Sequence, residues 1–343
     1  MTEESLVITT RKLNQVRNSF YVYLPRNWCD RFKLSKDSEV KIEQSADGIL
    51  KIIPPQFVTQ GPQRAKFIID EENKESIVNL LIGSYIVGTG EIELEFGSDL
   101  DISTREEVSQ WVRRLPGFEI LDEHSQSIII SDTSEKQGVF PILRRQFSTA
   151  KYMLTSLVDT MKTGKHKEAE RIIDRDEDVD RHRYFVERLC HLSLQNPAYA
   201  RRIQIAPPDA LHFSLATKYV ERIADHICEA ILQLLRLEKI NAKLVKTAEK
   251  LVEVYIETTS IFFRIERSKG IDKRNTAEEA KKAFTCHQHT KDVSEELDRI
   301  GGSYEKSASS ETLLALHLGR ISSYCEDIAE VAMNRIIEFG FNQ

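Results

Sequence analysis

Carboxylate side chains recur at helical spacing in two stretches of the second half of the chain. Glu221, Asp225 and Glu229 follow one another every four residues, so on a helix they project from nearly one face. Asp176 and Asp180 have the same spacing inside an acidic run. Like charges this close repel each other. A bound cation removes the repulsion, because hard and borderline cations take carboxylate oxygens as ligands, so two packed helices with these acids could form a metal site.

The same residues also suit two solvent-facing helix surfaces. Arg175 and Arg222 lie beside the acids in the sequence and could act as local counter-charges. Spacing alone leaves both interpretations open.

A concentration of positive charge lies near the N-terminus. Residues 9–36 hold seven cations and one acid, a local net charge of +6 in a chain whose formal net charge is −6. Such density suits contacts with the phosphates of duplex DNA, with amide and hydroxyl groups adding hydrogen bonds. The residues expected to contact DNA are Arg11, Lys12, Asn14, Arg17, Asn18, Ser19 and Arg26. The alternative is a dimerisation module with solvated cations.

Length and composition bound the class of protein. A chain of 343 residues with 41% hydrophobic residues is long enough for two or three domains. Its five cysteines are odd in number and scattered, which indicates reduced thiols rather than a disulfide framework or a zinc knuckle. The N-terminus lacks a signal-peptide pattern, and the longest uncharged stretch is too short and polar to span a bilayer. We therefore expect a cytoplasmic protein without membrane insertion.

Three segments of different periodicity predict a multi-domain α+β fold. Residues 1–57 alternate apolar and polar residues around one short helix after Pro25, with a hairpin signal at Asp47-Gly48. Residues 63–133 predict a small α/β domain, ferredoxin-like or a relative. Within it, residues 88–90 fit a helix C-cap better than a phosphate-binding loop.

Residues 137–343 show helical periodicity alone. The expected helices are 138–163, 165–195, 208–237, 240–268, 271–300 and 308–339, with breaks at glycines and prolines. A shift of 98 residues lays 219–226 over 317–324. Because these segments belong to the third and sixth helices, we expect a bundle of two three-helix repeats.

The helical segment resembles a known family in its acidic stretches. Residues 219–226, YVERIADH, resemble the ERIGDH signature of the PhoU family of phosphate-uptake regulators, and residues 172–180, IIDRDEDVD, resemble the acidic motif of its preceding helix. In some members these motifs hold metal clusters. The resemblance implies a divalent or trivalent metal, such as iron, zinc or magnesium. Its implied ligands are Asp176, Asp180, Glu221 and Asp225, with Asp174 and Glu229 as helpers.

The second repeat departs from that pattern. Gly319 and Ser323 stand where the signature has Glu and Asp. We therefore expect no equivalent metal site in the second repeat.

The N-terminal segment resembles another family. Residues 11–28, RKLNQVRNSFYVYLPRNW, are similar to the SpoVT/AbrB swapped-hairpin domain, and the similarity continues through 34–40 and Asp47-Gly48. Asp37-Ser38 stands where the family usually has Gly-Asp. The resemblance implies a barrel of interleaved hairpins from two chains, with basic loop residues on DNA. Because so small a unit buries little surface by itself, we expect a homodimer. The order of the domains resembles the archaeal form of phosphate-uptake regulator.

Three classes of function follow. The first is a transcriptional regulator of phosphate uptake whose helical domain responds to a metal or signal. The second is an adaptor that binds a phosphate transporter or sensor kinase, with an N-terminal unit that only dimerises. The third, a dinuclear-metal hydrolase, is set aside because the sequence offers no nucleophile–base pair, oxyanion loop or histidine-rich cage.

Overall fold

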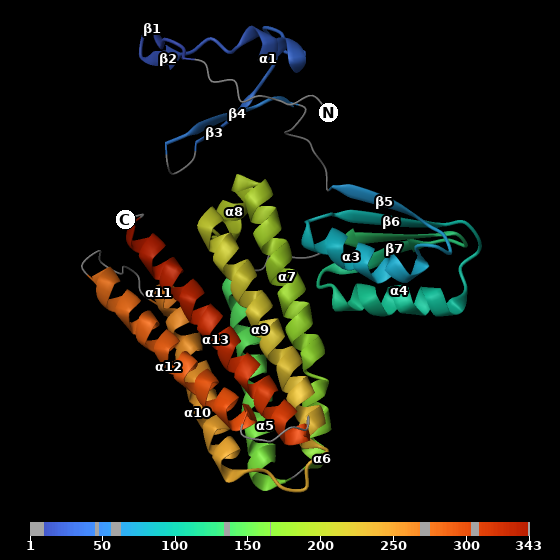
Figure 1. The fold of residues 1–343 in the computed structure, drawn as a ribbon. Helices are drawn as coiled ribbons and strands as arrows, with labels where there is room; N and C mark the ends of the chain where they lie inside the picture. Colours follow the sequence, from blue (N-terminus) through green and yellow to red (C-terminus); the bar gives the residue numbers. More distant parts are fainter. Residues whose placement is uncertain are drawn as a thin grey trace. The chain divides into compact units, whose positions relative to one another are not determined.

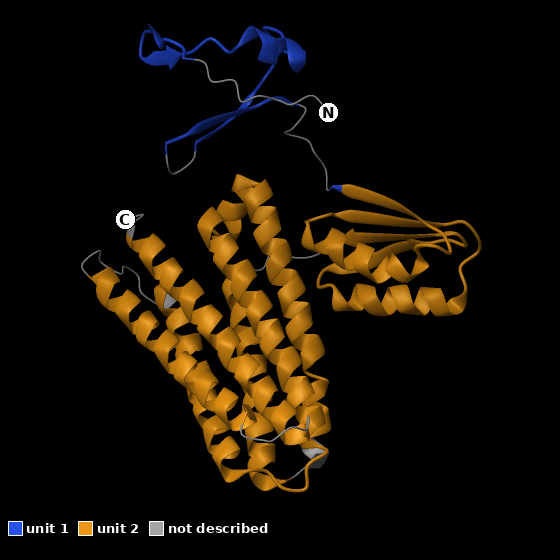
Figure 2. Ribbon diagram, viewed as in Figure 1, with its two compact units in different colours: residues 1–63 blue, residues 64–343 orange. Residues whose placement is uncertain are grey.

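The computed structural model describes residues 10–44, 48–55, 63–133, 138–164, 166–267, 275–302 and 309–341. The chain divides into two compact units, residues 1–63 and 64–343 (Figure 2). The boundary falls in the linker expected after the β-rich segment. The α/β segment and the helical segment both belong to the second unit.

The first unit consists of two short hairpins and one helix. Its elements are β1 (Asn14–Val16), β2 (Ser19–Tyr21), α1 (Arg26–Arg31), β3 (Lys41–Gln44) and β4 (Leu50–Ile53). β1 pairs with β2 and β3 with β4, both antiparallel, as two separate sheets. The helix after Pro25 is where the sequence places it. No barrel closes within the described part of the unit, so the swapped-hairpin barrel stays a prediction. Asp47 and residues 6–9, the first half of a strand expected over 6–13, lie outside the described residues.

This unit has almost no core. Pro54 is its one buried side chain among the residues described. Leu13, Phe20 and Tyr23 are 69%, 67% and 67% exposed, and Ile42 is 61% exposed. Isolated two-stranded hairpins are marginally stable in water. Apart from ring contacts such as Tyr21 with Tyr23 and Trp28 with Phe32, many of its apolar side chains are therefore left exposed.

The α/β part of the second unit is a four-stranded sheet with helices on one face (Figure 1). Its elements are β5 (Arg64–Ile69), η1 (Lys74–Ser76), α3 (Ile77–Ile86), β6 (Glu91–Phe96), α4 (Ile102–Arg114), β7 (Phe118–Glu123) and β8 (Ser127–Asp132). The strand order is β5-β6-β8-β7, with β5 and β6 parallel. A ferredoxin-like order is wrong, because that fold runs β-α-β-β-α-β and this chain runs β-α-β-α-β-β.

A glycine after the end of α3 allows this end of the helix to pack closely against α7. Gly88 has φ +93°, and the Thr89 amide donates to the Ser84 carbonyl at 3.0 Å, so the predicted C-cap is confirmed. A Cβ on Gly88 would lie 2.7 Å from Leu192 Cδ2. Glycine is therefore needed here both for the backbone turn and for the close contact.

One buried arginine joins the α/β part to the helices. Arg188, 2% exposed, donates to the Tyr85 carbonyl at 2.6 Å and to the Asp132 carboxylate at 2.5 Å. Its guanidinium also lies over the rings of Tyr85 and Phe118, 4.8 and 5.0 Å from their centroids. The contact combines charge-assisted hydrogen bonds with cation–π attraction.

The helical part is a bundle of six long helices with shorter pieces between them (Figure 1). The first three-helix group and its additions are α5 (Val139–Thr163), α6 (His166–Ile173), α7 (Asp176–Gln195), α8 (Pro197–Ile203) and α9 (Pro207–Leu234). The second comprises α10 (Ala242–Phe262), α11 (Arg264–Arg267), α12 (Thr276–Gly302) and α13 (Ser310–Phe341). No helix among the described residues is long and apolar enough to cross a membrane.

Three local details differ from the sequence expectation. The helix expected over 165–195 is interrupted between α6 and α7, and the helix expected over 240–268 is interrupted between α10 and α11. The break expected after Asn196 contains α8, because the Asn196 side chain accepts hydrogen bonds from the amides of Ala198 and Tyr199 and Pro197 occupies the first turn. Asparagine followed by proline is a favourable helix start as well as a turn signal.

The two groups meet along α9 and α13. Tyr219 stacks on Tyr324, and His226 Nδ1 lies 3.0 Å from His317 Nδ1. The 98-residue shift relates Tyr219 to His317 and His226 to Tyr324. The Tyr219–Tyr324 contact and the His226–His317 contact therefore occupy equivalent places in the two repeats. The contacts across this interface therefore follow the expected internal repeat.

Candidate functional site

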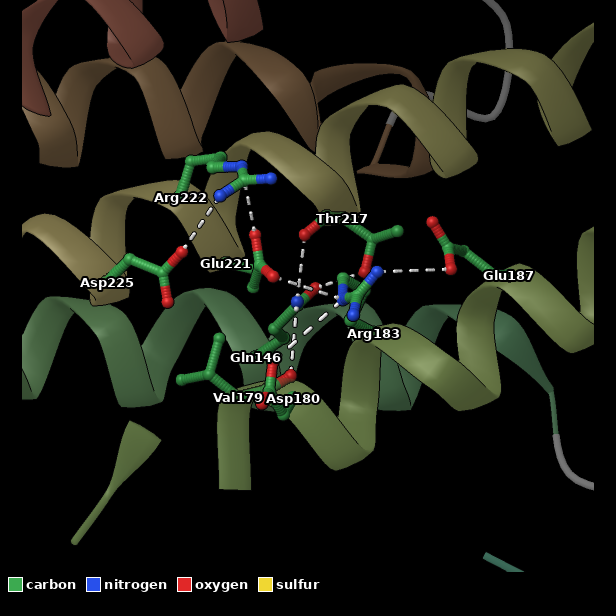
Figure 3. A network of polar contacts seen from close by, with 9 residues as sticks. All are labelled: Gln146, Val179, Asp180, Arg183, Glu187, Thr217, Glu221, Arg222 and Asp225. Atoms are coloured by element: carbon green, nitrogen blue, oxygen red, sulfur yellow. Dashed lines mark hydrogen bonds and ion pairs between the residues drawn. The ribbon is translucent and has the colours of Figure 1, made fainter. Parts of the chain in front are cut away.

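The acidic residues of two helices meet where α7 packs on α9 (Figure 3). Asp176 and Asp180 come from α7, and Glu221 and Asp225 from α9. The negative charges of the other three acids lie close enough to Asp176 to raise its pKa. The structure thus brings the four expected carboxylates into one cluster, here called the acidic cluster.

Helix ends help to position these acids. Asp176, Glu177 and Asp178 form the first turn of α7, where the positive end of the helix dipole favours negative charge. Arg175 pairs with Asp178 at 3.0 Å, so it acts as a local counter-charge within this acidic stretch. Arg222 pairs with Asp225, at 3.2 Å.

A guanidinium group stands among the carboxylates (Figure 3). Arg183 Nε lies 3.5 Å from Glu221 Oε1 and 3.9 Å from Asp180 Oδ1, and Nη1 lies 3.5 Å from Glu187 Oε2. The Arg183 side chain is 17% exposed. All three separations exceed the 2.7–3.2 Å range of N–H···O hydrogen bonds. Arg183 is therefore an internal counter-ion held by charge more than by directed bonds.

A neutral polar contact lies beside the cluster and ties three helices together (Figure 3). Buried Gln146 of α5 donates to the carbonyls of Thr217 on α9 and Val179 on α7, at 3.0 and 3.3 Å. The Thr217 hydroxyl donates back to Gln146 Oε1 at 2.6 Å. Because buried polar groups are costly unless paired, these bonds fix the relative position of α5, α7 and α9.

Burial and mutual repulsion raise the pKa values of the clustered acids. Burial, and then the charges of Asp180, Asp225 and Glu221, raise the pKa of Asp176 to about 7. Burial likewise raises the pKa of the carboxyl groups of Asp180, Glu187, Glu221 and Asp225, although Arg183 opposes the change in all four. Five carboxyl groups share the guanidinium groups of Arg183 and Arg222, and Arg114 and Lys218 act on Asp180 and Glu187 at the edges.

The cluster has buried oxygen atoms that make no hydrogen bond. These are Asp176 Oδ1 and Glu221 Oε2, of which Glu221 Oε2 lies 3.6 Å from Arg222 Nε. No three His, Cys, Asp or Glu side chains within the described ranges are arranged as they stand around a common ion. The residue types fit a hard cation, provided that the Arg183 guanidinium moves aside. Asp174, between α6 and α7, and Glu229, one turn beyond Asp225, are exposed at the edges.

Four contributors were missed by sequence reasoning: Gln146, Arg183, Glu187 and Thr217. Asp180, Arg183 and Glu187 lie at i, i+3 and i+7, which places them along one helix face. Gln146 interrupts an apolar stripe of α5 beside Leu143 and Phe147. A polar residue in such a stripe was the available signal for a buried polar contact.

The second repeat carries different groups at the equivalent place. The Ser323 hydroxyl lies 3.4 Å from that of Ser294 on α12. A Cβ on Gly319 would lie 3.4 Å from Asp298 Oδ1. Hydroxyls and a close helix contact thus replace the paired carboxylates of the first repeat.

The residues expected to contact DNA lie on the first hairpin and near it. Asn14, Arg17, Asn18 and Ser19 belong to β1, β2 and their turn, where Arg17 has φ +54°. Arg11 and Lys12 immediately precede β1 and are exposed. Arg26, on α1, is 3.5 Å from Asp30, and both side chains are largely exposed.

Comparisons with known proteins find similarity in the helical part of the chain. Residues 143–232, from α5 to α9, match the sequence profile described as the PhoU domain. The solved structure of the phosphate transport system regulatory protein PhoU from Streptococcus pneumoniae is similar over 57% of this chain and 91% of its own, with 15% identity and a TM-score of 0.42. A search of curated protein sequences finds no match. The four residues of the acidic cluster therefore lie inside the segment that matches the PhoU-domain profile.

Proposed function

We propose that this protein is a transcriptional regulator of phosphate uptake. The observation that carries the proposal is the PhoU-domain match over residues 143–232, which spans all four members of the acidic cluster. The similar solved protein is a phosphate transport system regulatory protein. In the proposal, the helical part responds to a cation or another signal and the N-terminal unit binds double-stranded DNA.

The N-terminal unit supports the proposal by its charge and its lack of a core. Six of the seven residues proposed to contact DNA are exposed, and Asn14 is half-buried. The apolar residues of its hairpins are more than half exposed at Leu13, Phe20, Ile42 and Leu50. Pairing of two chains would bury these side chains, and each Å² of apolar surface removed from water contributes about 25 cal/mol of stabilisation. We therefore propose a homodimer whose paired hairpins present the basic residues.

Alanine replacement of Arg11, Lys12 and Arg17 is expected to weaken DNA binding at all sequences. Each lost phosphate contact lowers the slope of log affinity against log salt by about one, so the slope should fall by about three per chain, or about six for the proposed homodimer. Fluorescence anisotropy with duplex DNA at several salt concentrations measures it. The matched control replaces Arg171, Arg236 and Lys239, exposed cations of the helical part, and should leave the slope unchanged. An unaltered slope in the first variant would favour the adaptor function.

A divalent or trivalent cation is proposed to bind Asp176, Asp180, Glu221 and Asp225 as the Arg183 guanidinium moves aside. The combined change Glu221→Ala and Asp225→Ala should abolish copurifying or added metal, because it removes half of the carboxylate ligands. Elemental analysis after purification without chelator measures the bound ion. The control removes two exposed acids of the second repeat, Glu295→Ala and Asp298→Ala.

Two outcomes would contradict the cation proposal. Metal that survives the first double substitution would place the site elsewhere. A parent protein that holds no iron, zinc, magnesium or manganese, even after these are added back, would leave the acidic cluster neutralised by Arg183 and protons alone.

A further inference from the structure

A cavity lies between the α/β sheet and the helices, away from the acidic cluster. Its volume is about 570 Å³, within the range of ~300–1,000 Å³ typical of small-molecule sites. The sheet side contributes Gly117, Glu119 and Thr133, and the helices contribute Arg145 of α5 and Arg181 of α7. Because both parts of the second unit form its walls, an occupant would contact the two at once.

Positive groups of the cavity lack partners. Arg145 and Arg181 are exposed, and neither guanidinium has a hydrogen bond or ion pair to the part of the chain that the structure describes. His182 also lines the cavity. Both guanidinium-bearing residues and this imidazole therefore line one cavity.

The acids that line the cavity neutralise the charges of Arg145 and Arg181 only partly. Asp178 is already engaged by Arg175 at 3.0 Å. Glu119, on the sheet side, is exposed. The local charge on the helix side is therefore positive and available to a ligand.

The lining also includes apolar residues. Ile142 is 3% and Phe185 7% exposed, and Pro116 lines the cavity from the sheet side. Guanidinium groups recognise phosphate oxygens through paired N–H donors. A small apolar area beside two guanidinium groups suits an organic group attached to the phosphate.

We propose that this cavity binds a small phosphate-bearing metabolite, with its phosphate on Arg145 and Arg181 and its organic part against Phe185 and Ile142. The inference is independent of the proposed regulatory function. A ligand here would bridge the sheet and the bundle and would thereby stabilise their contact through Arg188.

Isothermal titration of the full chain with AMP, adenosine and inorganic phosphate tests the proposal. We expect AMP to bind, adenosine to bind at least about 30-fold more weakly, and phosphate to compete with AMP. Arg145→Gln combined with Arg181→Gln should weaken AMP at least about 30-fold. Glu119→Gln should tighten it severalfold, because it removes a nearby negative charge. Arg171→Gln combined with Arg236→Gln removes the same charge elsewhere and should have no effect.

Phosphate as tight as AMP would still support oxyanion recognition and would identify free phosphate as the ligand. Two results would overturn the proposal: no binding of AMP or phosphate at millimolar concentration, or AMP binding that the Arg145 and Arg181 changes leave unaltered. Arg145 and Arg181 are exposed, so these variants should fold, and circular dichroism melting verifies it.

Discussion

Replacing Arg183 with methionine should lower the free energy of unfolding by about 2–3 kcal/mol at pH 8. The change keeps most of the side-chain volume but leaves Asp180, Glu187 and Glu221 without their shared counter-ion. Fully buried pairs typically lose about 3–5 kcal/mol when one partner is removed. The longer separations at Arg183, 3.5–3.9 Å, place the expected loss below that range. Urea unfolding of chelator-treated protein measures it.

The pH dependence of this loss follows from the raised pKa values. Burial raises the pKa of Asp180, Glu187 and Glu221, the acids beside Arg183. These acids carry less charge at low pH, so the Arg183→Met defect should grow from pH 5 to pH 8. The folded pKa of Asp176 is about 7 against an ordinary value of 3.8, so the folded state holds more protons between pH 4 and 7 and the free energy of unfolding falls as pH rises through that window. Asp176→Asn should flatten the pH dependence of the unfolding free energy.

Arg222→Gln is the matched control, because this side chain is 48% exposed and exposed ion pairs contribute about 0–1 kcal/mol. A divalent cation should restore stability to Arg183→Met more than it stabilises the parent, since the ion then occupies the place of the guanidinium. Equal stability of Arg183→Met and the parent at pH 8 would show that Arg183 is not the counter-ion of the cluster.

Arg188→Met should separate the sheet from the bundle and cost about 3 kcal/mol. The substitution leaves the Tyr85 carbonyl and the Asp132 carboxylate without their charged donor and removes the cation–π contacts with Tyr85 and Phe118. Hydrogen exchange should accelerate in α3, β7 and β8, while the amides of α10, α12 and α13 keep their protection.

Asp132→Asn is the milder comparison, because Arg188 then keeps its bond to the Tyr85 carbonyl and an amide oxygen can still accept from it. We expect less than half of the Arg188→Met effect. If Arg188→Met left exchange in α3 and β7 unchanged, apolar packing such as that of Gly88 against Leu192 would be sufficient to hold the sheet on α7.

Local patterns in the sequence predicted much of the second unit. Ile92, Leu94 and Phe96 alternate with acids in β6, and burial follows the same alternation, because a half-buried strand exposes every second residue. The six long helices follow from apolar periodicity and from end signals such as Gly164, which has φ +67°. These features depend on neighbours in sequence, so one sequence suffices to find them.

Features that depend on distant partners were not predicted. The position of β8 between β6 and β7 results from long-range pairing, which periodicity does not encode. The counter-ion role of Arg183 depends on Glu221 in another helix. In the first unit, Phe20 and Ile42 stay 67% and 61% exposed in the single chain, so its barrel stays a prediction.

The α9–α13 interface has a consequence for how the two repeats can differ. In this interface a helix packs on its counterpart in the other repeat. That is the arrangement of an isologous dimer, here within one polypeptide. In a dimer of separate chains, every substitution appears in both halves. When both halves belong to one chain, a change such as glycine at 319 or serine at 323 alters one half only. Fusion thus allows one half to keep the carboxylates while the other serves as scaffold, and it sets the stoichiometry at one acidic cluster per chain.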